Sequence, residues 1–370
     1  MRLRSALVNA AAVAVSLATA LVAGEIALRT FPGLLPPDVL MRLHWTSIID
    51  TGMPSIADDH LGFRYPANYE GRLALRDFDF RYRTDANGFR NDSPLPETAD
   101  VVVLGDSLTF SYGVDDDEAW VKLLNDRLDD LSVVNLGLIG ASPRQSLRVY
   151  RTFGRAFSPK VVLFALFTGN DITDEGQFDR WVDADVSDNF DVWRFRSASD
   201  SAVSRLLQRS YVVMLAGYTV RNVRERSSSL TIDLPSGARL NLVPRLVDRA
   251  EPGDPAFERV MSTIQRAAEE IAADGSRMVV LLLPTKEEVY LPLHGMPPLD
   301  TTHVFARALD KRGLPYFNIT ADLQTRAATG EQLFFEVDGH PNAAGYRAIA
   351  DSVHGYLMRN GPALGLSALR

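Results

Sequence analysis

Apolar residues occur in two patterns that alternate along the chain from about residue 100 onward. Short apolar runs of the buried-strand type lie at 101–104, 133–136, 161–167, 278–283 and 316–319. Apolar positions recur with helical spacing at 117–130, 143–157, 254–274, 301–312 and 342–359. Strands that alternate with helices predict a parallel sheet with helices on both faces. A ligand should then bind outside the carboxyl ends of the strands, where such sheets have their crevice.

The first 30 residues follow a different pattern. Arg2 and Arg4 precede an uncharged stretch, 5–24, that is rich in Ala, Val and Leu. As a helix this stretch would span roughly 30 Å, about one hydrocarbon core of a bilayer. The two arginines should stay in the cytoplasm, which predicts a single-pass membrane anchor with the remaining chain outside the cytoplasm. A cleaved signal peptide is the first alternative, because Ala-Thr-Ala at 18–20 fits a cleavage site, and a buried core helix is the second.

The rest of the chain divides into two predicted parts. Residues 31–97 are expected to form a linker, rich in proline and glycine over 32–40, and a small β-rich segment. Polar and aromatic residues alternate over 77–83, which predicts a strand. Residues 98–362 are expected to form the main domain.

An insertion at about 174–253 interrupts the alternation of strands and helices in this domain. It begins with acidic and aromatic residues, continues with a helical pattern at about 201–225, and ends with a predicted hairpin over 230–243. Its acidic run at 183–191 predicts a solvated loop. Calcium binding is the alternative, but the run lacks the glycine and the final glutamate of an EF-hand loop.

The composition excludes several classes of protein. The 370 residues include 39 Lys and Arg and 47 Asp and Glu, so the net charge is −8 and a nucleic-acid partner is not expected. The absence of cysteine excludes a disulfide framework, a cysteine nucleophile, thiolate metal sites and a lipid-modified N-terminal cysteine. The six histidines are scattered along the chain, which argues against a multi-histidine metal site. We therefore expect no metal and no cofactor, and the oligomeric state stays open.

Two strand ends carry residues suited to nucleophilic chemistry. Ser107 stands in Gly-Asp-Ser-Leu just after the run 101–104, where a nucleophile would have to lie. The Gly-x-Ser-x-Gly elbow is absent, which disfavours the α/β-hydrolase fold. After the run 133–136, Gly137 and Gly140 allow the backbone to approach a ligand and to point N–H groups at it. Each segment alone is also typical of an ordinary turn.

Two further strand ends complete a possible acyl-transfer site. Asn170 follows the run 161–167 and could donate its side-chain amide, although Asn-Asp at this place is also typical of a helix cap. Asp338 lies two residues before His340 at the start of the last helical pattern. A nucleophile, two oxyanion donors and a base, each at a strand end, are the parts that acyl transfer needs.

These four segments resemble the signature blocks of the SGNH (GDSL-type) hydrolase family, in a membrane-anchored bacterial form. The resemblance covers about 100–175 and 275–360. It implies a three-layer α/β/α, flavodoxin-like fold and a serine esterase or acyl hydrolase that acts on an ester of a small molecule, a carbohydrate or a lipid. It assigns Ser107 as nucleophile, His340 as base, and the backbone N–H groups of Ser107 and Gly140 with the Asn170 side chain as the oxyanion hole.

The third member of the triad departs from the family pattern. The family usually has its aspartate three residues before the histidine, where this chain has Val337. Asp338 is two residues before His340 and Glu336 is four before. We expect the turn at Gly339 to fold Asp338 back onto the ring, so that Asp338 accepts the Nδ1–H of His340 and Nε2 faces Ser107.

Two other functions remain open. The segment 283–290 resembles a Pro-x-Lys…Tyr segment of alginate O-acetyltransferase-type SGNH proteins, which would make the protein an O-acyltransferase acting on polysaccharide. Lys286 is alternatively a solvated lysine, and Trp181 and Trp193 either line a sugar groove or anchor the insertion on the core. A non-catalytic, membrane-tethered binding module is supported only by the shifted position of Asp338.

Overall fold

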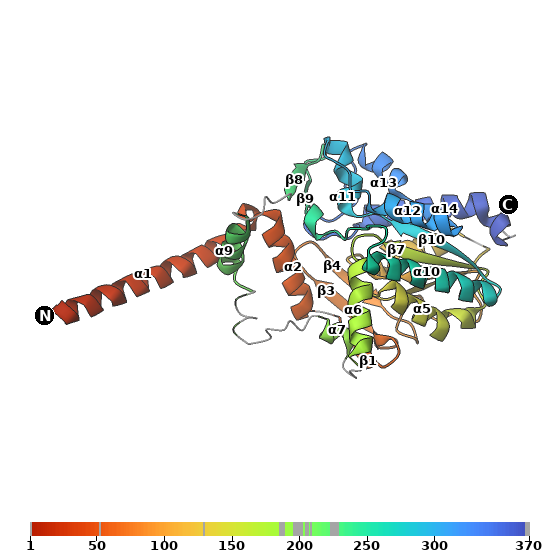
Figure 1. Ribbon diagram of the computed structural model, residues 1–370, viewed down its shortest axis with the longest axis horizontal. Helices are drawn as coiled ribbons and strands as arrows, with labels where there is room; N and C mark the ends of the chain where they lie inside the picture. The colour runs from red at the N-terminus through yellow and green to blue at the C-terminus, as the bar shows by residue number, and fades with distance from the viewer. Residues whose placement is uncertain are drawn as a thin grey trace.

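A five-stranded parallel sheet, whose strands β7 and β10 are labelled in Figure 1, forms the centre of the protein. The strand order is β11-β10-β7-β5-β6. The computed structural model describes residues 2–51, 53–128, 130–184, 189–194, 203, 207, 209–222 and 229–366. The strands are β5 (Val101–Gly105), β6 (Val133–Gly137), β7 (Val161–Phe167), β10 (Arg277–Leu283) and β11 (Tyr316–Asn318). All five lie where the apolar runs predicted them.

The strand order explains where a site can form. The chain moves from β5 to β6 in one direction and then returns to place β7 on the other side of β5. This order is the flavodoxin-like doubly wound arrangement, which leaves a crevice at the carboxyl ends of the two strands where the direction reverses. The register aligns Gly105 with Gly137 at that edge. The segments after β5, β6 and β7 therefore meet there.

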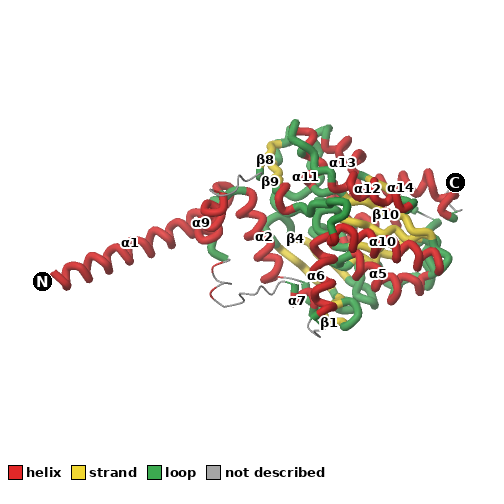
Figure 2. The backbone as a smooth tube through the Cα atoms, in the orientation of Figure 1, coloured by secondary structure: helices red, strands yellow, loops and turns green. Residues whose placement is uncertain are grey.

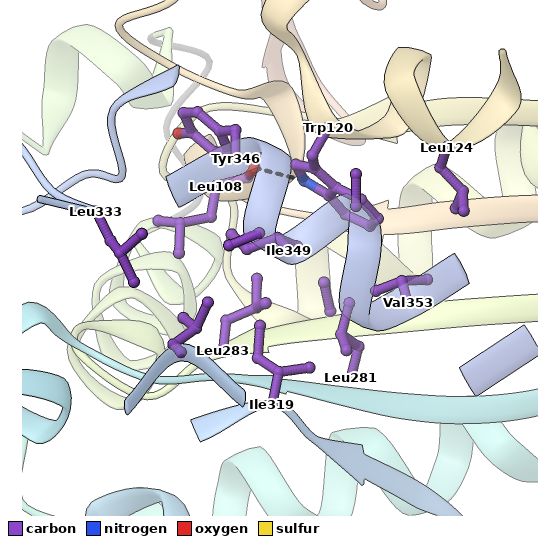
Figure 3. Close-up of a cluster of buried hydrophobic side chains, with 14 of the residues drawn as sticks. Leu108, Trp120, Leu124, Leu281, Leu283, Ile319, Leu333, Tyr346, Ile349 and Val353 are labelled. Atoms are coloured by element: carbon purple, nitrogen blue, oxygen red, sulfur yellow. Dashed lines mark hydrogen bonds between the residues drawn. The ribbon is translucent and has the colours of Figure 1, made fainter. Parts of the chain in front are cut away.

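Helices cover both faces of the sheet, as predicted. Val101 and Val103 point into one core and Val102 and Leu104 into the other, because successive side chains of a strand alternate between faces. The first core contains Trp120, whose indole N–H donates to the Leu108 carbonyl at 2.9 Å (Figure 3). Its helices are α4 (Trp120–Asn125), α11 (Lys286–Tyr290), α13 (Thr320–Ala327) and α14 (Ala343–Leu364). The second core lies under α5 (Pro143–Thr152), α10 (Pro255–Ala273) and α12 (Thr301–Arg312).

The helix boundaries differ clearly from the predicted ones in three places, one of which is α14, where the helix continues to Leu364, beyond the predicted end at 359. The pattern at 117–130 gives only a 3₁₀ turn, η2 (Asp116–Glu118), and the short helix α4. The pattern at 143–157 is divided into α5 and η3 (Gly154–Phe157). Phe153 separates the two, and the second piece ends at Ser158, which has φ +48°.

The N-terminal apolar stretch is helical and projects from the body of the protein as α1 (Arg2–Thr30) (Figures 1 and 2). Its residues 5–30 are long and apolar enough to cross a membrane, and none of that window is buried. A signal sequence has the same properties. The exposure removes the alternative of a buried core helix.

The segment after α1 is not the linker that its prolines predicted. After η1 (Pro32–Leu34), helix α2 (Pro37–Thr51) begins with Pro37, which fits the first turn of a helix because that position needs no N–H donor. Val39, Leu40 and Leu43 form a buried face that packs with Val337. The spacing of these apolar residues outweighs the proline signal.

Two hairpins follow, which agrees with the predicted β-rich segment. They are β1 (Ile56–Asp58) with β2 (Gly62–Arg64), and β3 (Glu70–Ala74) with β4 (Asp79–Arg83). Their buried aromatic residues, such as Phe63 and Phe80, form one cluster with Phe110 of α3 (Ser107–Phe110). The two hairpins therefore pack at the carboxyl end of the sheet, beside the helix that follows β5.

The insertion contains α6 (Asp171–Asp183), α7 (Phe190–Trp193), α9 (Tyr211–Asn222) and the predicted hairpin, β8 (Leu230–Asp233) with β9 (Arg239–Leu242). Short turns η4 (Pro244–Leu246) and η5 (Pro292–His294) complete the chain. Trp181 is buried and stacks on Phe178, and Trp193 stacks on Phe190, so both tryptophans anchor the insertion. Part of the helical prediction at 201–225, together with Asp185 and Asp188 of the calcium alternative, lies outside the described residues.

Candidate active site

Ser107 stands at the first position of α3, directly after the central strand β5. The Asp106 carboxylate accepts the Leu108 N–H at 2.9 Å and so caps this short helix. Gly105 has φ +153°, and a Cβ there would collide with the Thr109 hydroxyl. The turn therefore requires glycine at this position. It places the Ser107 hydroxyl at the sheet edge, with only 4% of the residue exposed.

Hydrogen bonds join Ser107, His340 and Asp338 in one line. His340 Nε2 lies 2.8 Å from Ser107 Oγ, and His340 Nδ1 lies 2.6 Å from Asp338 Oδ1. A carboxylate only accepts hydrogen bonds, so Nδ1 carries the proton and Nε2 accepts from the serine hydroxyl. Glu336 instead lies partly exposed, 3.9 Å from the Arg76 guanidinium. The contact expected between Asp338 and His340 is therefore present in spite of the unusual spacing.

The charges of the pair reinforce each other. Burial opposes ionisation of Asp338, but the His340 charge and the hydrogen bonds from His340 and His44 outweigh it and hold the pKa of Asp338 well below its usual value. Burial likewise opposes protonation of His340, yet the Asp338 charge and hydrogen bond raise the pKa of His340 above its ordinary value. An ionised Asp338 and a more basic imidazole are what a serine-activating base needs.

Lys286 stabilises the loop that carries Asp338 through hydrogen bonds to its backbone. The Lys286 ammonium is buried and donates to the carbonyls of Phe335, Glu336, Val337 and Asp338 at 2.9–3.3 Å. The interpretation of Lys286 as a solvated lysine is therefore wrong. A capping box between Thr285 and Glu288 starts α11 and aims the Lys286 side chain at the loop.

The N-terminal segment supplies two more contacts to the same loop, and the sequence analysis missed both. Asp77, between β3 and β4, accepts the N–H groups of Val337 and Asp338, each at 2.7 Å. His44 of α2 is buried, and its Nε2 lies 2.5 Å from Asp338 Oδ2. No motif marks these residues, because they lie about 260 and 294 positions from their partners.

Gly140 and Asn170 lie at the same sheet edge, after β6 and β7. Gly140 has φ +64°, and among the described residues nothing accepts a hydrogen bond from its N–H. Asn170 occupies the N-cap position of α6, but its side chain makes no capping hydrogen bond, so the helix-cap interpretation of this side chain is wrong. Its Oδ1 is buried without a partner in the described part of the chain. No hydrogen bond joins Gly140 or Asn170 to Ser107 within that part.

Arg194 from α7's C-terminal end covers Gly140. Its guanidinium donates to the Gly140 carbonyl at 2.6 Å and pairs with Asp191 at 2.5 Å. A Cβ on Gly140 would collide with this guanidinium. The insertion thus reaches the predicted oxyanion segment, which periodicity could not show.

Three buried carboxyl groups, those of Asp106, Asp171 and Asp174, lie in the segments that carry Ser107 and Asn170. Burial, aided by neighbouring carboxylates, raises the pKa of Asp171 well above its ordinary value, and burial raises the pKa of Asp174 to about 8. Burial also raises the pKa of Asp106. In the described part of the chain, no three acidic or histidine side chains converge in a way that could hold a metal ion.

The sequence model of the GDSL-like lipase/acylhydrolase family matches residues 103–348. The chain belongs to this family. It is therefore a serine hydrolase that acts on esters. The match includes Ser107, Gly140, Asn170, Asp338 and His340, whereas the N-terminal segment with its two contacts to the Asp338 loop precedes it.

Several solved structures are similar to this GDSL-type hydrolase. A lipolytic protein of the G-D-S-L family from Veillonella parvula has 14% sequence identity and a TM-score of 0.38, over 70% of this chain and 98% of that chain. The psychrotrophic esterase EstA from Pseudoalteromonas sp. has 16% identity and a TM-score of 0.37, over 71% of this chain and 99% of that chain. No curated protein matches the sequence.

Proposed function

We propose that the protein hydrolyses an ester of a small molecule, carbohydrate or lipid through Ser107, His340 and Asp338. The observation that carries this proposal is the 2.8 Å contact between His340 Nε2 and Ser107 Oγ, with the other ring nitrogen tied to Asp338. This is the geometry in which an imidazole removes a proton from a serine hydroxyl.

The reaction would run in two steps. His340 takes the Ser107 proton while Oγ attacks the ester carbonyl, and then gives that proton to the leaving alcohol. In the second step His340 takes a proton from water, the water oxygen attacks the acyl-enzyme, and the carboxylic acid is released as Ser107 regains its proton. The backbone N–H groups of Ser107 and Gly140 and the Asn170 amide would stabilise the oxyanion, and each such donor typically contributes about 10²–10³ in rate.

Water is the proposed acceptor of the acyl group. The alternative of acyl transfer to a polysaccharide drew on Lys286, but that ammonium is already engaged by four backbone carbonyls. The alternative of a non-catalytic module drew on the shifted aspartate, but Asp338 reaches His340 from its shifted position. The observations therefore favour hydrolysis over both alternatives.

The test of this function is turnover of a short-chain aryl ester by the full chain in detergent. Ser107→Ala should lower kcat to background without lowering the melting temperature, because only a hydroxyl is lost. Ser146→Ala is the matched control, since Ser146 is also buried but lies on α5. Normal turnover in a folded Ser107→Ala protein would rule out the assignment. Addition of a polysaccharide acceptor to the assay separates hydrolysis from transfer.

We also propose that α1 is a retained anchor in the cell membrane and that the catalytic domain lies outside the cytoplasm. The span of 26 residues, none of them buried, is longer than the 7–15 apolar residues of a signal peptide. Arg2 and Arg4 before it favour this orientation. Membrane fractionation with protease treatment of intact cells tests the proposal. A soluble form that begins near residue 21 would indicate a secreted protein instead, and a cytoplasmic pool would contradict export.

A further inference from the structure

Both oxygens of the Asp338 carboxylate are used, and they are used by different parts of the chain. Oδ1 accepts the backbone N–H and the ring Nδ1–H of His340, at 2.7 and 2.6 Å. Oδ2 lies 2.5 Å from Nε2 of His44. The carboxylate is 1% exposed, so water does not supply these hydrogen bonds. Its orientation depends on the two histidines.

His44 is itself held in one orientation. It lies on α2, whose residues Val39, Leu40 and Leu43 are buried, and its ring packs edge-on against Phe78 with the centroids 5.7 Å apart. Because Asp338 is ionised, His44 must donate from Nε2. Its Nδ1 is buried and has no hydrogen-bond partner in the described part of the chain, so Nε2 makes the hydrogen bond that the ring has there.

The unusual spacing of Asp338 and His340 explains why a second donor is needed. Asp338 lies only two residues before His340, and its Oδ1 accepts hydrogen bonds from both the backbone N–H and the ring of His340. The terminal torsion of an aspartate has a broad energy minimum, so hydrogen bonds and not the torsion itself set the direction of the carboxylate. A donor on Oδ2 restricts that direction further than contacts on Oδ1 alone.

We propose that His44 of the helix α2 is a positioning residue for the catalytic pair. The proposal rests on the proposed function of Ser107, His340 and Asp338. His44 does not touch Ser107; it acts by fixing the Asp338 carboxylate, which in turn fixes the tautomer and direction of the His340 ring. Only residues 31–36 separate α1 from α2, so the anchor and the triad are connected through this helix.

The test compares three variants of the full chain in the aryl-ester assay. His44→Phe keeps an aromatic ring against Phe78 but removes the donor. His44→Gln keeps an N–H group at a similar reach. Val39→Ala is the control, because it removes packing from the same helix without touching Asp338.

We expect His44→Phe to lower kcat by about 10–100-fold with KM unchanged, the range seen when the outer hydrogen-bond partners of metal-bound histidines are removed. His44→Gln should retain most of the activity, and Val39→Ala should lower the melting temperature with kcat unchanged. Loss of the His44 hydrogen bond leaves more negative charge on the Asp338 oxygens that face His340, which raises the pKa of His340 further. The acid limb of the pH profile should therefore move to higher pH in His44→Phe.

Several titratable and charged groups surround the pair. They are His44 from α2, Asp77 between β3 and β4, Asp106 and Tyr112 around α3, Lys286 from α11, and Tyr346 from α14.

Two results would overturn the proposal. One is His44→Phe with wild-type kcat and an unchanged pH profile. The other is an equal loss of kcat in His44→Phe, His44→Gln and Val39→Ala, which would mean that the helix acts through stability alone.

A measurement that does not depend on turnover separates this proposal from the proposed function. If the wild type is no more active than Ser107→Ala, the function fails. NMR of protein labelled with ¹⁵N-histidine then decides the role of His44. The Nε2–H tautomer with a strongly downfield proton, lost in Asp338→Asn, would support the contact, and a different tautomer would contradict it.

Discussion

The Lys286 ammonium contacts the backbone of Asp338 and not the Asp338 carboxylate, since Nζ donates to the Asp338 carbonyl at 2.9 Å. Three preceding carbonyls accept from the same nitrogen. Burial of an ammonium is costly unless hydrogen bonds replace its water, and four carbonyl dipoles do so here. Lys286 therefore fixes the backbone of the loop, while His44 and His340 fix its carboxylate.

Lys286→Met should both destabilise the protein and slow it. The substitution keeps the apolar stem but removes the ammonium donor from the four loop carbonyls, and loss of a charged hydrogen bond typically costs about 1.5–3 kcal/mol. We expect a clear fall in melting temperature and a lower kcat. Lys311→Met, at an exposed position of α12, is the control. An unchanged melting temperature would show that the loop does not need this support.

Asp338→Asn should be nearly as damaging as His340→Ala, whereas Glu336→Gln should be mild. The side-chain amide that this substitution introduces would offer the His340 ring an N–H group and favour the wrong tautomer, and such a change typically costs up to about 10⁴ in rate. Glu336 contacts Arg76 and not His340. Steady-state kinetics on folded variants measures both effects. A larger loss in Glu336→Gln would make Glu336 the orienting carboxylate.

The pH profile should report His340. The serine is activated only when the imidazole is neutral, so activity should rise with pH along a limb centred above 6.5, because the Asp338 charge and hydrogen bond outweigh burial and raise the pKa of His340. In Asp338→Asn that charge is absent, so the limb should move to lower pH while the plateau falls. Measurement of kcat/KM from about pH 5 to 10 tests this; a limb that does not move would mean that another group titrates.

Asp174→Asn should stabilise the protein, and increasingly so as the pH rises. Burial raises the pKa of Asp174 from 3.8 to about 8, so the folded state loses stability as the pH rises between these values and no further above the upper one. The gain from asparagine should grow by up to about 1.4 kcal/mol per pH unit between them. Urea unfolding of both proteins at about pH 5, 7 and 9 measures this difference in the free energy of unfolding. Asp183→Asn, exposed on the same helix, should show no such trend.

The sequence alone determined the sheet and the main parts of the site. Apolar runs such as 161–167 mark fully buried strands, because a strand with helices on both faces needs apolar residues at every position. Ser107 and Asn170, which follow β5 and β7, were predictable for a related reason, whereas His340 follows α13 and not a strand, so the expectation of a strand end there is wrong. Parallel strands bring their carboxyl ends to one edge, so residues far apart in the chain meet there without any further information.

The hydrogen bonds that His44 and Lys286 make to Asp338 follow from the packing of distant segments and could not be predicted from the sequence. His44 looked like a scattered histidine in a proline-flanked segment, and Lys286 like a solvated lysine after a strand. Each acts on a loop that is distant in the chain, by 294 residues for the hydrogen bond between His44 and Asp338. Periodicity and turn chemistry describe local conformation, whereas a buried hydrogen bond depends on which elements pack together. The sequence therefore identified the groups that react, and the packing of α2 and α11 determined the groups that position them.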